Sequence, residues 1–107
     1  MATMPKPALP KRIEHFGDQR DESITTTLRK GRREEVEFFS QRDIRVVFDF
    51  EEGTPFHQGS EFLVRAGQAT PSGPLHERVA AGHKYRYRVH AMQGGGQGAD
   101  PTIIIQG

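Results

Sequence analysis

The sequence predicts an all-β fold, a single antiparallel β-sandwich. Three observations favour it. Short segments alternate apolar and polar residues with a period of two, which is typical of half-buried strands. Twelve glycines and seven prolines interrupt these segments with turn signals. No stretch sustains the 3.6-residue period of an amphipathic helix. Several short strands separated by frequent turns are typical of a sandwich or a small barrel.

The clearest strand is predicted over residues 44–50, where every second residue is apolar and the charged Arg45 and Asp49 fall between them; the apolar residues are Ile44, Val46, Phe48 and Phe50. A second strand is predicted over Lys84–His90, with tyrosines on one face and arginines on the other. The Ile103–Ile105 run indicates a last strand buried on both faces. That last strand spans residues 102–106, and the four remaining predicted strands lie at 24–28, 35–39, 61–65 and 75–81.

The chain divides into an arm and one domain. Its 107 residues suffice for one domain and are too few for two. Residues 1–22 are polar and contain three prolines, which disfavour a regular helix, so we interpret them as an extended N-terminal arm. The β-sandwich then spans residues 23–107. We expect removal of residues 1–21 to leave the thermal transition nearly unchanged.

Composition excludes several kinds of chemistry. The chain has no cysteine, so it has no disulfide, thiolate metal site or cysteine nucleophile. Its 15 basic and 14 acidic residues give a net charge of +1, which supplies no overall attraction for nucleic acid. No run approaches the ~20 apolar residues that a membrane-spanning helix needs. The sequence therefore predicts a soluble, cytoplasmic protein without a membrane partner.

Three segments together resemble a small bacterial cupredoxin-like domain. Gly82 with Tyr85 and Tyr87 is similar to the family's glycine followed by a Y-x-Y strand, and residues 44–48 are similar to its apolar strand. Residues 100–105 are similar to the closing strand after Asp-Pro. The resemblance covers roughly residues 23–107 and implies a Greek-key sandwich, for which an immunoglobulin-like arrangement is the other candidate.

The same resemblance implies that the copper site is missing. A blue-copper site needs two histidines, a cysteine thiolate and a weak axial ligand. The family pattern places these ligands at Ile44, Val89, Met92 and residues 94–98, and none of these positions carries the expected ligand. The implied protein is a metal-free member without a cofactor.

Histidines and serines offer no compact catalytic or metal motif. The five histidines show no spacing typical of a zinc or copper site; they are His15, His57, His76, His83 and His90. Ser60 near His57 lacks the glycine-flanked elbow of a serine nucleophile, and Ser72 has the surroundings of a turn residue. The sequence thus predicts no enzyme, and a metal protein with a non-standard histidine set remains an alternative.

Two groups of arginines are the candidate binding residues. The first group lies in a predicted hairpin tip, and the second forms a stripe on one sheet face; together they are Arg29, Arg32, Arg33, Arg45, Arg86, Arg88 and His90. Arginine is common in protein interfaces because its planar fork pairs with carboxylates. Carboxylates at positions 34, 35 and 37 interrupt the first group, which disfavours nucleic acid. We therefore predict a non-enzymatic binding or accessory module acting through protein contacts, with weak nucleic-acid binding as an alternative.

Overall fold

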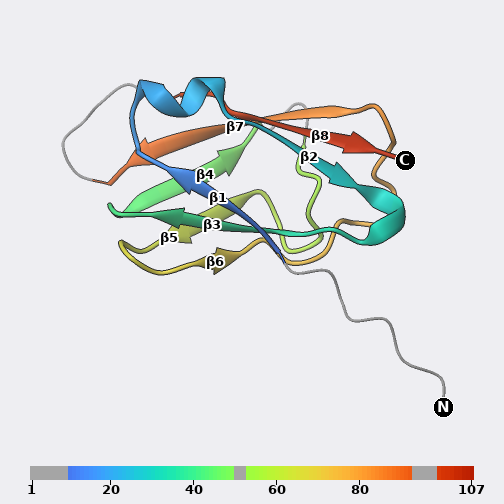
Figure 1. The fold of residues 1–107 in the computed structure, drawn as a ribbon, viewed down its shortest axis with the longest axis horizontal. Coiled ribbons are helices and arrows are strands. Elements are labelled where there is room, and N and C mark those ends of the chain that lie inside the picture. Colours follow the sequence, from blue (N-terminus) through green and yellow to red (C-terminus); the bar gives the residue numbers. More distant parts are fainter. Residues whose placement is uncertain (1–9, 50–52, 93–98) are drawn as a thin grey trace, which may run out of the picture.

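The structure, a computed structural model, describes residues 10–49, 53–92 and 99–107, and these residues form two β-sheets and two short 3₁₀ helices (Figure 1). In chain order the elements are β1 (Lys11–His15), η1 (Gln19–Ser23), β2 (Thr25–Arg29), η2 (Lys30–Arg32), β3 (Val36–Ser40), β4 (Ile44–Phe48), β5 (Glu61–Val64), β6 (Thr70–Pro71), β7 (Lys84–Ala91) and β8 (Thr102–Gln106). The prediction of an all-β fold is confirmed. Neither helix in the described part of the chain is long and apolar enough to cross a bilayer.

The sheets are mixed, so the prediction of a fully antiparallel arrangement is wrong. One sheet has the strand order β1-β3-β6 and the other β2-β8-β7-β4-β5. β1 runs parallel to β3, and β2 runs parallel to β8, as Figure 1 shows. The cause is η2, which carries the chain from one sheet to the other. β2 and β3 are therefore not hairpin partners, and β2 finds its partner at the far end of the sequence.

The core lies between the two sheets and is rich in aromatic rings. Strand alternation buries Phe38 on β3, Phe48 on β4 and Tyr87 on β7, each at 2% exposure or less. The Phe38 and Tyr87 rings, whose centroids are 5.9 Å apart, join one sheet to the other. The Phe48 and Tyr87 rings lie 5.0 Å apart between neighbouring strands. The predicted phase of the strand over residues 44–48 is confirmed.

The expectation of a peripheral arm is wrong for residues 11–22. β1 pairs with β3 along its whole length and buries Ile13, at 4% exposure, and His15, at 1%. η1 then buries Asp21, while its N-cap Asp18 accepts a hydrogen bond from the Arg20 amide. The polar side chains of β1 concealed its alternation in the sequence. Residues 1–9 lie outside the described residues.

Three further elements differ from prediction. The segment 75–81 is not a strand; Leu75 forms only an isolated bridge with Phe56, and a turn follows. β6 lies within residues 67–74, a stretch whose glycines and prolines are typical of a loop. In β8, Ile103 and Ile105 are buried, but Ile104 is only half-buried because it lies on the outer face of the sheet. The glycine-rich segment 93–98 and the predicted strand end at Phe50 lie outside the described residues.

Candidate functional site

The predicted arginine stripe exists on the outer face of the five-stranded sheet. Register pairs Arg45 of β4 directly with His90 of β7, and Val47 with Arg88. Direct partners on antiparallel strands have Cβ atoms about 5 Å apart on the same face. Arg86 lies two residues before Arg88 and so shares that face. We call Arg45, Arg86, Arg88 and His90 the arginine face.

Two exposed ion pairs flank this arginine face. Arg45 Nη1 lies 3.5 Å from Glu61 Oε1, and Arg88 Nε lies 3.4 Å from Asp100 Oδ1. All four side chains are about half exposed to solvent. Exposed pairs of this kind contribute only about 0–1 kcal/mol to stability. Carboxylates of a partner can therefore replace them at little cost.

A hollow of about 420 Å³ opens beside the arginine face. Its lining combines three cationic or titratable side chains of β7 with two carboxylates and apolar surface; the lining residues are Val47, Phe48, Asp49, Arg86, Tyr87, Arg88, His90 and Asp100. The half-buried Val47 lies between the rows of charged residues. The face thus offers a shaped, mixed surface that is suited to side chains of a protein.

The other predicted arginines lie apart from this face. Arg86 of β7 is paired with Thr102 of β8, and Thr102 is in turn paired with Thr25 of β2. Arg29, at the other end of β2, is paired with Gln106. Arg29 is therefore four residues along the edge strand from that row, about 13 Å at the usual strand rise. Arg32 and Arg33 follow still farther on, at η2. The structure therefore places the two predicted groups of arginines on separate surfaces.

Arg33, the residue after η2, lines a second, larger hollow together with Lys30, a groove of about 1010 Å³ to which Arg32 does not contribute. Its other wall comes from distant loops, which no local sequence signal connects to η2. The lining residues are Lys30, Arg33, Glu35, His57, Pro74, Leu75, His76, Glu77 and Arg78. Sequence reasoning missed the contribution of residues 74–78.

The histidines are dispersed. His76 uses both ring nitrogens in the turn, because Nε2 lies 3.0 Å from the Thr54 carbonyl oxygen and Nδ1 accepts from the Arg78 amide. His83 packs against the Tyr85 ring, with the centroids 4.5 Å apart. Among the residues that the structure describes, no three His, Asp or Glu side chains are grouped so as to hold a metal ion.

The positions that the cupredoxin resemblance assigns to copper ligands are apolar. Ile44 and Val89 are buried in the core, at 0% and 1% exposure. Met92 is half-exposed, and residues 94–98 lie outside the described ranges. Ser72 is a buried turn residue whose hydroxyl accepts from the Val36 amide and donates to the Gly73 carbonyl.

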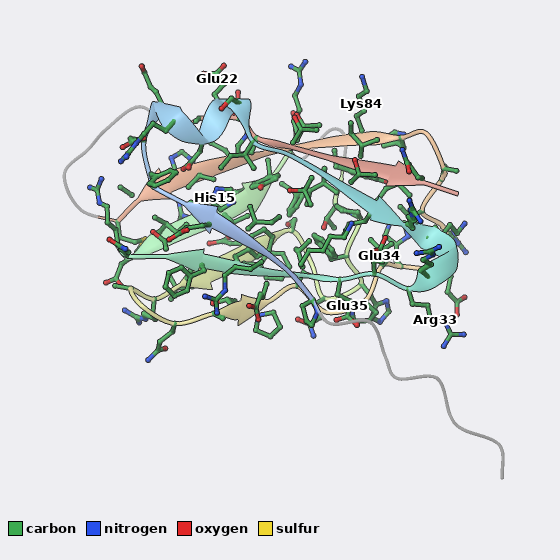
Figure 2. All side chains as sticks on the ribbon, viewed as in Figure 1. His15, Glu22, Arg33, Glu34, Glu35 and Lys84 are labelled. Carbon is green, nitrogen blue, oxygen red and sulfur yellow. The ribbon has the colours of Figure 1, made fainter. Side chains whose placement is uncertain are left out.

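A buried polar cluster is the feature that sequence reasoning missed most completely. His15 lies in the interior (Figure 2), where its Nε2 is 2.9 Å from the Tyr87 hydroxyl. Its Nδ1 is 3.5 Å from Asp21 Oδ1 and has no closer polar partner among the described residues. Both carboxylate oxygens of Asp21 accept backbone amides, from Phe16 at 2.8 Å and Gly17 at 2.9 Å. The side chains of His15 and Asp21 have no exposed surface, and the cluster holds β1 and η1 against β7.

The cluster makes stability depend on pH in the acid range. Burial raises the pKa of Asp21, but the His15 ring and the two amides outweigh burial and hold this pKa below the ordinary value of an aspartate. A carboxyl with a lowered folded-state pKa stabilises the fold fully above its unfolded pKa, and this stabilisation is lost as pH falls through the folded value. Burial and the charge of Asp21 also raise the pKa of Tyr87.

We therefore expect Asp21→Asn to lower the free energy of unfolding by about 2 kcal/mol at neutral pH, since charge-assisted hydrogen bonds are lost. As the pH falls below about 4, the free energy of unfolding should decrease less in this variant than in the wild type. Urea melts at several pH values measure both effects. Equal pH dependence in the two proteins would show that Asp21 is not a stabilising carboxylate.

Comparison with protein-family models, curated proteins and solved structures finds no match for this chain.

Proposed function

We propose that this chain is a non-enzymatic, metal-free binding module whose arginine face contacts an acidic surface of another protein. The observation that carries the proposal is the register of β4 and β7, which gathers Arg45, Arg88 and His90 on one solvent-facing side of the sheet. Arg86 extends the group along β7.

The chemistry of the face supports a protein partner. Arginine forks pair with carboxylates in fixed geometry, and their stems cover apolar surface. Here the guanidinium groups of the arginine face lie beside the half-buried Val47 and a hollow of about 420 Å³. The sheet already fixes the backbone of these residues, so binding requires ordering of their side chains but not of the backbone. The interspersed carboxylates of Glu61 and Asp100 suit a protein surface of mixed charge better than a continuous row of phosphates.

The finer fold assignment is part of the same proposal. A core enclosed between two sheets supports a sandwich of cupredoxin-like type, and the buried Ile44 and Val89 support a member that lacks copper. The relationship itself stays a prediction, as does the cytoplasmic location. Elemental analysis of untagged protein tests the absence of metal, and stoichiometric copper or zinc would contradict it.

The experiment that tests the proposed function is affinity capture from a lysate of the source organism, with and without nuclease treatment. We expect a defined protein to be recovered in both cases. We also expect no retention of the purified chain on immobilised DNA or RNA at physiological salt. Recovery that disappears with nuclease, or retention that weakens steeply with added salt, would instead identify a nucleic-acid binder.

A further inference from the structure

The groove at η2 is distinct from the arginine face and has its own chemistry. Lys30 and Arg33 form one wall, and Arg78 stands on the other, with Pro74 and Leu75 supplying apolar surface between them. Figure 2 shows Arg33 at one end of the molecule, at the turn that follows η2. The volume of the groove, about 1010 Å³, is at the upper end of the range of small-molecule sites.

Backbone hydrogen bonds fix the wall of the groove that residues 57 and 74–78 form. The His57 amide donates to the Pro74 carbonyl at 2.9 Å, and the His76 amide donates to the Pro55 carbonyl at 3.0 Å, so the two loops of one wall are joined. The start of β3 is tied to the same loop because the Ser72 amide donates to the Val36 carbonyl at 2.8 Å. This wall is therefore held in place before a ligand binds, which lowers the entropy cost of binding.

The η2 end is more electropositive than its sequence suggests. Of the three carboxylates that follow the basic cluster, Glu34 accepts the Arg29 amide at 2.8 Å and lies 3.3 Å from Lys11 Nζ. Glu37 lies 2.9 Å from Arg12 Nε. Two of the three are therefore neutralised by cations of β1, and only Glu35 reaches the groove.

The cations that line the groove, by contrast, are not neutralised by ion pairs with carboxylates among the described residues. Within the described ranges, Lys30, Arg33 and Arg78 form no ion pair. Glu35 and Glu77 are the two acidic residues of the lining. Three cations against two carboxylates leave the lining with a net charge of +1, which favours an anion small enough to contact the cations and avoid the carboxylates. A phosphate monoester carries about −1.5 to −2 charges at neutral pH, more than one carboxylate supplies.

We propose that this groove binds a small organic phosphate monoester. The phosphoryl group lies among Lys30, Arg33 and Arg78, and the apolar body of the ligand packs on Pro74 and Leu75. Guanidinium forks bind phosphate oxygens in pairs, which fixes the orientation of the ligand. The site operates independently of the arginine face.

Phenyl phosphate is the probe that tests this site, because it joins a phosphate monoester to an apolar ring. Its titration into the ¹⁵N-labelled protein should shift amides near Arg33, Leu75 and Arg78 saturably at millimolar concentration. Inorganic phosphate at the same ionic strength should bind more weakly, since it lacks the ring. The double variant Arg33→Gln/Arg78→Gln should weaken binding about tenfold or more, while Arg65→Gln, on an exposed residue outside the groove, should not.

Three outcomes would overturn the proposal. Shifts that do not saturate, or that the double variant leaves unchanged, would indicate an adventitious ion only. Equal affinity for phenyl phosphate and inorganic phosphate would remove the role of Pro74 and Leu75. Tighter binding of a short oligonucleotide at these same amides would assign the groove to nucleic acid. None of these outcomes bears on protein capture by the arginine face.

Discussion

A chain that begins at Phe16, and therefore lacks β1, is expected to be unfolded at room temperature. β1 forms the full parallel ladder with β3 and buries Ile13 and His15. Losing one buried aliphatic side chain alone costs about 2–5 kcal/mol, and the truncation also removes the partner of Tyr87 and leaves one side of β3 unpaired. Small domains are stable by only about 5–15 kcal/mol in total.

Circular dichroism and a two-dimensional NMR spectrum of the truncated chain measure this effect. A chain that begins at Pro10 keeps β1 and serves as the matched control. A cooperative melt of the truncated chain within a few degrees of that control would show that β1 is peripheral, as the sequence first suggested.

Phe48→Ala is expected to lower the free energy of unfolding by about 3–5 kcal/mol, the usual loss when a buried aromatic ring is truncated. Phe48 is 2% exposed, and its ring centroid lies 5.0 Å from that of Tyr87 and 5.6 Å from that of Phe56. Denaturant melts of the purified variant measure the loss.

Arg45→Ala on the same strand provides the control. Its side chain faces solvent and makes only an exposed ion pair at 3.5 Å, so the expected change is about 0.5 kcal/mol or less. Equal losses in the two variants would mean that the buried and exposed faces of β4 are interchanged.

The sequence predicts β4 and β7 well because their alternation is strong and local. In both strands, large apolar residues fill every second position, so the strand, its buried face and its exposed arginines follow from one pattern. For the same reason, the arginine face was predictable in outline. Its register, Arg45 opposite His90, was not, because pairing between strands 45 residues apart depends on the whole fold.

β1 escaped prediction because one of its two core positions holds a histidine. Burial of His15 depends on Tyr87, 72 residues away, and on Asp21, which is itself held by backbone amides. A polar side chain at a core position looks exposed until its buried partners are known. The same holds for the groove, since its walls come from η2 and from residues 57 and 74–78, which only the tertiary structure brings together.

The parallel ladders were unpredictable for a related reason. A basic turn between two alternating segments is typical of a hairpin, and residues 29–33 were interpreted in this way. The structure instead uses this turn as a crossover, with Arg33 in the left-handed region at φ 52°. Turn residues determine where the chain bends, but the burial of β2 against β8 determines which sheet it joins.

The most direct test of the arginine face is capture of the protein partner by charge-reversed baits. Arg45→Glu/Arg88→Glu reverses two charges on the face, and Arg32→Glu/Arg65→Glu reverses the same number elsewhere on the exposed surface. Both baits should melt within a few degrees of the wild type, because all four residues are exposed. We predict that the wild type and the Arg32/Arg65 bait recover the same protein, and that the Arg45/Arg88 bait loses it. Recovery by the Arg45/Arg88 bait at wild-type yield would contradict the proposal that this face is the binding surface.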